Sequence, residues 1–416
     1  MSTIPSVVEN ALEQTTMSSN LPRKNSAQKS LADVNFIANH AKAMLEDVRN
    51  SMMAPDPCKV APTFSLAQLA TLCGMEKSKA NYIAADNPGG LPVGTNIGGN
   101  RKREFLLSEA MQWISKFSPH GSRPAGTKAK KICIGNFKGG VTKTTTALAL
   151  AQGLSLRGRK VLLVDLDPQG SLTTLCGVLV YPTVKEEMTI MPYIYGDHDD
   201  LAYAAKPTYW SGVDLIPACG MVAQAEFHLP AMQAQDNTFE FWDLINKGVE
   251  PLLDQYDVII FDTPPALSYL TINALMAADI IIVPSPPNAL DYASSVQFWS
   301  LFADFSKAFM KIVPALATKK YDFISVLISK VENQKQATAI VKDWVHQTYT
   351  DMVLPIEITL TSGAQNAATA FGTAYDISNY SGTNKAYVKN REEYDAFASV
   401  IDSKIMQIWN SEASNG

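Results

Sequence analysis

The sequence predicts an α/β protein. A mostly parallel, twisted sheet with helices on both faces is preceded by an α-helical winged helix-turn-helix domain and an N-terminal helix. Three observations lead to this prediction. Near-continuous β-branched runs alternate with helical segments beyond residue 131, as expected for parallel strands that are buried on both faces. A glycine-rich turn joins the first of these strands to a helix. Two short helical patterns separated by a glycine lie upstream, at residues 63–83.

The composition predicts a soluble globular protein with more than one domain. The chain has 416 residues, of which 46% are hydrophobic and 18% charged, so it can bury sizeable cores in two or three domains. No apolar run reaches the length of a membrane span, and no basic stretch with an apolar block follows Met1, so we expect neither a span nor a secretory signal. The five cysteines are scattered without a C-x-x-C pair, which indicates reduced thiols in a cytoplasmic protein.

The net charge of −5 is unevenly distributed along the chain. Residues 55–130 carry ten lysines and arginines against five acidic residues, whereas residues 131–416 carry twenty against thirty. Residues 1–54 are balanced, with five of each. A basic module fused to an acidic one indicates that the first contacts nucleic acid.

The N-terminal 54 residues divide into a tail and a helix. Residues 1–25 are rich in Ser, Thr, Asn and Pro and are predicted to be disordered. Residues 26–54 are predicted to be helical, because apolar residues recur at 3-4 spacing: Leu31, Val34, Ala38, Ala41, Leu45, Val48 and Met52. This seam fits a short coiled coil that dimerises the protein, and it fits equally a helix that lies on its own neighbouring domain.

Residues 55–118 are predicted to form a winged helix-turn-helix domain. Ser65 caps a first helix, Gly74 makes the turn, and a second helix begins near Glu76. Residues 88–103 are rich in Gly, Pro and Asn and end in cations, as a β-wing would. The pattern resembles MerR-like DNA-binding domains, whose second helix enters the major groove by its N-terminal end. The resemblance assigns DNA contacts to Lys77, Ser78, Lys79, Asn81, Arg101, Lys102 and Arg103. The alternative is a small helical domain with a solvated basic loop.

Residues 119–130 are predicted to be a flexible basic linker, because Gly, Ser and Pro alternate there with cations. Residues 131–416 form the predicted α/β domain. Its first strand ends in the glycine-rich turn Lys138–Thr145 (KGGVTKTT), which opens a helix. Backbone amides and the helix dipole at such a turn bind phosphate, and a lysine supplies the counter-charge.

The turn does not match the strict phosphate-loop pattern, because Phe137 and Thr142 stand where the outer glycines belong. The additional lysine, Lys138, lies five residues before Lys143. This spacing resembles the deviant Walker A motif of the ParA/MinD class of P-loop ATPases. The alternative is a glycine-rich turn of an ordinary α/β protein. The resemblance assigns nucleotide binding to Lys138, Gly139, Gly140, Val141, Thr142, Lys143, Thr144 and Thr145.

Two further strands end in carboxylates, at the sheet edge where open α/β proteins bind ligands. Asp165 and Asp167 follow one apolar strand, and Asp262 follows another. The stretches resemble the Walker A′ motif and the Walker B motif of the same class. The resemblance implies ATP or ADP with Mg²⁺. It implies that Thr144, Asp165 and Asp262 bind the metal and that Asp262 also binds the nucleotide. Lys138, Lys143 and Asp167 are the implied catalytic residues. Residues 263–266 would sense the γ-phosphate.

The order of a helix, a helix-turn-helix and an ATPase domain resembles the large ParA proteins of plasmid partition. Residues 284–291 (PSPPNALD) resemble another of their motifs. The resemblance implies a homodimer that sandwiches ATP, with Lys138 of each subunit reaching the other's phosphates. It also implies slow hydrolysis stimulated by a ParB-type partner, binding of operator and non-specific DNA, autorepression, and a cytoplasmic, nucleoid-associated protein without a membrane.

The chain departs from the ParA pattern in its DNA-binding residues, and the residues that bind the adenine base are not assigned by the motifs. Residues 357–366 lack the arginine with which many ParA proteins bind non-specific DNA, so other cations must act: Lys385, Lys389 and Arg391 with Lys330 or Lys335. The adenine base is expected near residues 329–332, where Lys330 is one candidate.

Two other functions compete with a partition ATPase. The first is a nucleotide-regulated transcriptional repressor without motor activity, which would not need all three carboxylates. The second is a MinD-like positioning ATPase that cycles on a membrane. The C-terminal stripe that would support it (Phe397, Val400, Ile401, Ile405, Met406 and Trp409) has Lys404 as its only cation, so it indicates core packing instead.

Overall fold

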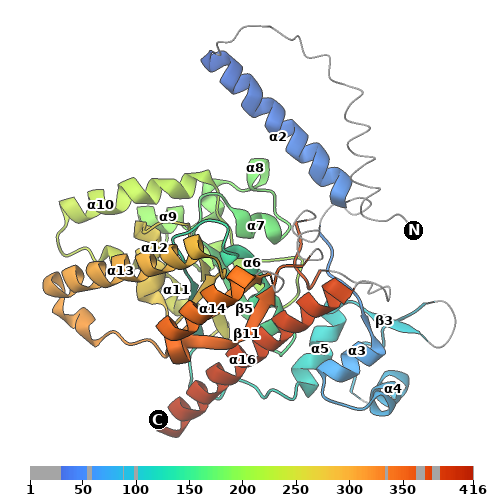
Figure 1. Ribbon diagram of the computed structural model, residues 1–416. Coiled ribbons are helices and arrows are strands. Elements are labelled where there is room, and N and C mark those ends of the chain that lie inside the picture. The colour runs from blue at the N-terminus through green and yellow to red at the C-terminus, as the bar shows by residue number, and fades with distance from the viewer. Residues whose placement is uncertain are drawn as a thin grey trace. The chain divides into compact units, whose positions relative to one another are not determined.

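The computed structural model describes residues 30–53, 59–87, 89–97, 102–332, 336–361, 371–376 and 385–415 (Figure 1). The chain divides into two compact units, Met1–Val60 and Ala61–Gly416. In the first unit, the described helix is α2 (Leu31–Met53). The carboxylate of Asp33 accepts hydrogen bonds from the amide and the hydroxyl of Ser30 at the start of this helix. The predicted helix is therefore present, its role in dimerisation stays a prediction, and the predicted tail, residues 1–25, lies outside the described residues.

The second unit begins with two helices, a hairpin and a third helix. The strands β1 (Phe64–Ser65), β2 (Thr95–Asn96) and β3 (Arg103–Phe105) form an antiparallel sheet in the order β1-β3-β2. The helices are α3 (Leu66–Leu72), α4 (Lys77–Asp86) and α5 (Leu107–Phe117). Ser65 caps α3 in a capping box with Gln68, and Gly74 turns the chain at φ +62°. The sequence predicted both features from residue type alone.

An eight-stranded sheet forms the centre of the second unit, in the order β11-β10-β9-β4-β8-β5-β7-β6. All neighbours are parallel except β6 and β7. The strands are β4 (Lys130–Ile134), β5 (Val161–Asp165), β6 (Lys206–Pro207), β7 (Val213–Ile216), β8 (Val258–Asp262), β9 (Ile280–Ser285), β10 (Phe323–Val331) and β11 (Val353–Thr359). The predicted mostly parallel sheet is confirmed.

Helices connect these strands and cover both faces of the sheet. They are α6 (Lys143–Ser155), α7 (Ser171–Leu175), α8 (Val180–Thr183), α9 (Met191–Tyr195), α10 (Ala225–Gln235), α11 (Leu244–Val249), α12 (Tyr269–Ala277), α13 (Ala289–Ile312), α14 (Gln336–Tyr349) and α16 (Lys385–Asn415). Short 3-10 segments lie between them: η1 (Glu186–Met188), η2 (Ala202–Ala204), η3 (Gly220–Gln224), η4 (Phe241–Asp243), η5 (Glu250–Leu252), η6 (Pro314–Thr318) and η7 (Thr350–Met352).

Among the described residues, three hydrophobic clusters fill the space between the sheet and its helices, and the smallest joins β10 to α14. Ile132 and Ile134 of β4 belong to the cluster that contains α6 and α16, whereas Cys133 belongs to the cluster with α12 and α13. Successive residues of a strand point to opposite faces, which explains this division. The C-terminal stripe is core, as predicted, because Phe397, Ile401, Ile405 and Trp409 are fully buried. The first cluster also includes Trp113 and Leu69, so α3 and α5 share a core with the sheet.

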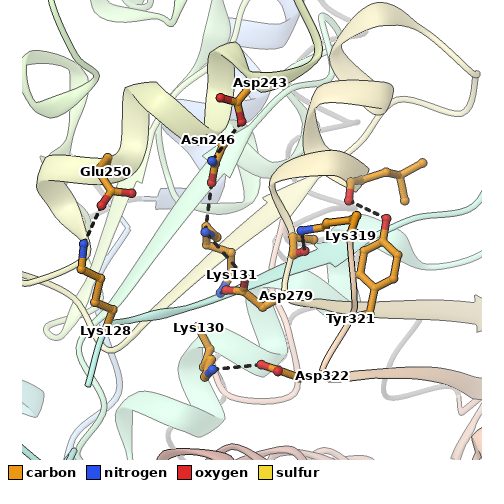
Figure 2. Close-up of polar contacts among 12 residues, drawn as sticks. Lys128, Lys130, Lys131, Asp243, Asn246, Glu250, Asp279, Lys319, Tyr321 and Asp322 are labelled. Carbon is orange, nitrogen blue, oxygen red and sulfur yellow. Dashed lines mark hydrogen bonds and ion pairs between the residues drawn. The ribbon is translucent and has the colours of Figure 1, made fainter. Parts of the chain in front are cut away.

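Figure 2 shows polar contacts that fix the amino-terminal edge of the sheet. Lys130 and Lys131 open β4. The Lys130 ammonium lies 2.9 Å from the carboxylate of Asp322, one residue before β10. The Lys131 amide donates to Asp279, one residue before β9, at 2.9 Å. Because β9 lies between β4 and β10, these contacts hold three strand starts together, at the edge opposite to the predicted nucleotide site.

The predicted flexibility of residues 119–130 is wrong. The Arg123 guanidinium donates to the carbonyl oxygens of Leu253 and Tyr256 at 2.8 and 2.7 Å. The Arg159 guanidinium donates to the carbonyl oxygen of Gly121 at 2.7 Å. These contacts join the segment to distant parts of the second unit, to which it belongs, so the segment is fixed within that unit. Gly, Ser and Pro content alone did not reveal these acceptors.

A buried ion pair completes this junction. The Arg159 and Asp402 side chains are 1% and 4% exposed, and their charged atoms lie 2.6 Å apart. The Arg159 guanidinium also lies 5.6 Å from the ring of Trp409. At the end of α6, Gly158 lies against Ser118 and Ile114, so the helical domain and α6 are in direct contact.

Replacing Asp402 with alanine tests how strongly this pair holds the fold. The substitution leaves a buried guanidinium without its carboxylate, so the free energy of unfolding should fall by about 3–5 kcal/mol. Urea denaturation followed by circular dichroism measures it. Asp304→Ala removes an exposed pair with Lys307 and should change the value by less than about 1 kcal/mol. Similar losses in both variants would contradict the assignment.

Candidate nucleotide site

The glycine-rich turn lies between β4 and α6, as predicted. Gly140 and Thr142 both have left-handed backbones, at φ +76° and +79°. Thr142 occupies the position of a glycine in the strict phosphate-loop pattern, and a β-branched residue in this conformation costs about 1–2 kcal/mol. Thr142 precedes α6 without a side-chain cap on the helix. The first-turn amides of α6 are therefore free of a side-chain cap, as an anion-binding helix start requires.

Lys143 is a buried cation at the first position of α6. Its ammonium donates to the carbonyl oxygen of Lys138 at 2.9 Å. Burial lowers the pKa of Lys143, while the nearby carboxylates of Asp262 and Asp167 raise it. The structure thus brings the lysine close to two predicted acidic residues that lie 24 or more positions away in the chain.

Asp165 and Asp262 end neighbouring strands and face each other in register across β5 and β8. Asp165 accepts hydrogen bonds from the amide and the hydroxyl of Thr173 at 2.9 and 2.7 Å, and from the amide of Asp167 at 3.1 Å. Burial nevertheless raises the pKa of Asp165 to about 7. Its oxygens organise the loop that carries Asp167, a role that the sequence analysis did not assign.

Asp262 is the carboxylate that is left without such support. Burial, and then the charge of Asp165, raise the pKa of Asp262 well above the ordinary value. Within the described residues, neither carboxylate oxygen has a hydrogen-bond partner. The Thr144 hydroxyl lies close enough to lower the pKa of Asp262, although it is outside hydrogen-bond geometry. A buried carboxylate beside a hydroxyl fits a hard divalent cation such as Mg²⁺, which takes oxygen ligands and one or two carboxylates.

Lys138 is held by its own chain. Its ammonium forms an ion pair with Asp291 in the first turn of α13. Its amide donates to the side chain of Asn136 at 3.0 Å, and Asn136 in turn donates to the carbonyl oxygen of Pro284 at 2.9 Å. Asp291 lies in the motif at residues 284–291, and no role was predicted for it. The opposite charges of the two motifs are the signal that could have paired them.

A cavity of about 550 Å³ adjoins the glycine-rich turn. It lies among the turn, the β9–α13 connection, the end of β10, and α14. Lys330 lines it, and its ammonium donates to the carbonyl oxygen of Gly140 at 2.6 Å. The stretch in which we expected an adenine contact therefore lies beside the glycine-rich turn. The walls are mostly apolar, as a nucleobase requires, and include Pro286, Pro287, Val341, Trp344 and Leu360.

The predicted DNA-binding residues are only partly available for contact. Lys77, Ser78, Lys79 and Asn81 are exposed at the start of α4, and Lys102 is exposed on the hairpin. Arg103 differs, because its guanidinium donates to the carbonyl oxygens of Ala84 and Val93 at 2.5 and 3.1 Å. It ties α4 to the hairpin, which argues against a phosphate contact. Arg101 lies outside the described residues.

Several other cations are also neutralised within the fold. Lys128 and Lys130 pair with Glu250 and with Asp322, so the positive charge of residues 55–130 overstates the cations available to DNA. Two of the substitutes proposed for the absent arginine are also paired: Lys389 with Glu393, and Arg391 with Asp395 and the ring of Tyr375. Lys385 is exposed, so its predicted contact with DNA stays a prediction. Lys335 lies outside the described residues. None of the described helices is long and apolar enough to cross a membrane.

The chain is similar to several known proteins. A family model described as an AAA domain matches residues 129–314. The chain is 27% identical over 372 residues to a putative replication protein A of Sinorhizobium fredii. This match covers 85% of this chain and 89% of the relative. It is 38% identical over 261 residues to protein SopA of Escherichia coli K12, which covers 61% of this chain and 66% of SopA.

A solved structure described as a partition protein has a TM-score of 0.61 and 18% identity, covering 91% of this chain and 99% of the other. At this identity the likeness shows the fold alone. The match extends beyond the residues of the AAA-domain model, so the shared fold includes most of the chain.

The pKa of Asp165 predicts a proton release when a magnesium nucleotide binds. Near pH 6.5 much of Asp165 is protonated, because its pKa is about 7. A bound cation favours the ionised carboxylate and lowers this pKa, so affinity should strengthen as pH rises through about 7 and then level off. Calorimetry in buffers of different ionisation enthalpy measures the protons released. Asp165→Asn should release fewer. Equal release by both proteins would sink the assignment.

Proposed function

Because this chain belongs to the ParA-type family of P-loop partition ATPases, we propose that it hydrolyses ATP to ADP and phosphate in order to segregate DNA. One observation carries the proposal. Asp165 and Asp262 lie in register on adjacent strands, and the buried Lys143 at the start of α6 lies near Asp262. A protein that only binds nucleotide would not need to bury two carboxylates side by side.

Each side chain of the site has a proposed task. The amides of the glycine-rich turn bind the phosphates, and Lys143 neutralises the β- and γ-phosphate oxygens. Asp167, whose carboxylate caps its own turn through the amide of Gln169 at 2.9 Å, orients the attacking water. Mg²⁺ held near Asp262 and Thr144 would offset the phosphate charge when bound. The cavity beside Lys330 receives the adenosine.

ATP-dependent dimerisation follows from the position of Lys138. In this structure its ammonium is occupied by Asp291 of the same chain. A triphosphate offered across a dimer interface carries more negative charge than one carboxylate, so we propose that Lys138 leaves Asp291 and contacts the partner's nucleotide. The exchange makes ATP itself the link between subunits.

Substitutions at this ion pair should shift self-association in opposite directions. Lys138→Ala should still bind ATP, through Lys143 and the amides, but should lose ATP-dependent dimerisation and phosphate release. Asp291→Asn frees Lys138 without removing it, so dimers should form at several-fold lower ATP concentration. Analytical ultracentrifugation over an ATP titration measures both effects.

Asp304→Asn is the matched control, because this carboxylate pairs only weakly with Lys307 on an exposed face. It should behave as the wild type. An unchanged dimer in Lys138→Ala, or no ATP turnover by the wild type, would refute the proposal.

Site-specific DNA binding is assigned to α4. The start of this helix presents Lys77, Ser78, Lys79 and Asn81 to solvent, while Ala80, Ile83 and Ala84 on the other side are buried. This division leaves one face free for a major groove. Lys102 on the hairpin is placed to contact the backbone. We propose that this surface binds the operator of the protein's own gene.

Lys77→Ala with Lys79→Ala should abolish operator binding and leave ATP turnover unchanged. In each single variant, Lys77→Ala or Lys79→Ala, the slope of log affinity against log salt should become shallower by about 1 for the lost phosphate contact. Fluorescence anisotropy with operator and scrambled duplexes measures these effects. Lys185→Ala, an exposed lysine paired with Glu187, is the control. Loss of turnover together with DNA binding would contradict the modular assignment.

A ParB-type partner is proposed to stimulate slow hydrolysis in a cytoplasmic, nucleoid-associated protein. A pure repressor remains the competing function, and it predicts no stimulation of turnover by partner or DNA. A membrane-cycling ATPase is disfavoured, because the apolar stripe of α16 that would bind lipid is buried in the core.

A further inference from the structure

The loop after Asp262 is anchored at both ends, and the carbonyl oxygen of Ala266 in its middle accepts the Thr271 hydroxyl of α12 at 2.8 Å. At its start, the Thr263 hydroxyl donates to the carbonyl oxygen of Ile134 at 3.0 Å, and the side chain is buried. Pro265 and Ala266 in the middle are exposed. At its end, Ser268 caps α12 by accepting the amide of Thr271 at 3.1 Å. Any displacement of the loop therefore has to be borne by the start of α12.

A distant carboxylate holds that start. Glu226 of α10 accepts the amide of Tyr269 at 3.0 Å through one oxygen and the amide of Leu270 at 3.4 Å through the other. These are the first two amides of α12, which have no partner within the helix. A carboxylate at this position also interacts favourably with the helix dipole. Glu226 thus fixes where α12 begins, and with it the end of the loop.

The segment that leads to Glu226 begins at the other catalytic loop. The Thr173 hydroxyl donates to Asp165 and accepts the amide of Ala218 at 2.9 Å. Gly170 lies against the same residue, since a Cβ there would be 2.9 Å from the carbonyl oxygen of Ala218. Residues 218–226 therefore contact the Asp165–Gly170 loop at one end and the start of α12 at the other.

We propose that Glu226 is a positioning residue that couples the two loops across the nucleotide site. The inference rests on the proposed ATPase function and adds a residue that touches neither phosphate nor water. Through residues 218–226, the loop that carries Asp167 and the loop after Asp262 keep a fixed separation. The attacking water and the γ-phosphate are aligned only while this separation holds.

The test compares Glu226→Ala and Glu226→Gln with the wild type. Alanine removes both acceptors, so kcat should fall by about tenfold, within the range that a misplaced catalytic group costs, while KM for ATP changes less than about twofold. Glutamine keeps one carbonyl acceptor and should recover part of kcat. Hydrogen exchange supplies a readout that needs no turnover: ATP, but not ADP, should slow exchange in residues 218–226 of the wild type and not of Glu226→Ala.

A matched control separates positioning from simple helix capping. Glu109 accepts the amide of Leu106 at 2.8 Å at the start of α5, so Glu109→Ala removes the same kind of contact away from the nucleotide site. Both alanine variants should lose similar thermal stability, and only Glu226→Ala should lose kcat. A kcat for Glu226→Ala equal to that of Glu109→Ala, or unchanged exchange of residues 218–226, would overturn the inference. A wild type without turnover would instead refute the proposed function.

Discussion

The site depends on the burial of two carboxyl groups side by side. Asp165 and Asp262 are fully buried on adjacent strands, which raises the pKa of both carboxyls. The fold supports them unequally, because Thr173 and the amide of Asp167 donate hydrogen bonds to Asp165, whereas neither oxygen of Asp262 has a hydrogen-bond partner in the part of the chain that the structure describes. Burying unpaired charge is costly. When ionised, the two carboxylates need nearby cations, and Lys143 supplies only one positive charge. A divalent cation bound with a triphosphate would supply the rest.

Contacts elsewhere in the sheet stabilise the strands that hold these buried carboxyl groups. At the opposite edge, Lys130 and Lys131 pin the starts of three strands to one another. The left-handed backbone of Thr142 adds strain at the glycine-rich turn, and strain of this kind persists only where surrounding structure enforces it. Stable contacts lie at the amino-terminal edge of the strands, whereas the Asp262 oxygens, which lack hydrogen-bond partners among the described residues, lie at the carboxyl-terminal edge. Ligand binding thus changes the electrostatics of one edge without loosening the other.

Sequence patterns predicted the features that depend on neighbouring residues. Apolar runs marked the strands. Lys143, Asp165 and Asp262 follow three of these runs, so they were expected at one edge of the sheet, because parallel strands end together. Contacts between distant segments were missed: Glu226 meets α12 over 43 positions, and Arg159 reaches Gly121 from 38 positions away. Such contacts depend on how helices cross the sheet, which no local pattern encodes. The flexible linker was predicted wrongly for this reason, and Arg103 was assigned to DNA although backbone carbonyls hold it.

The fixed junction changes how the two proposed activities relate. With a flexible linker, α4 and the nucleotide site would act independently. Instead, α6 starts at Lys143, and the turn that follows it at Gly158 contacts Ser118 and Ile114 beside α5, within one compact unit. Since α5 and α3 share a core with the sheet, a dimer built across the nucleotide face also sets the separation of its two α4 helices. Half-site spacing on DNA follows from such a separation. Under the proposed function, ATP occupancy and operator recognition are therefore linked by geometry, without any moving segment between them.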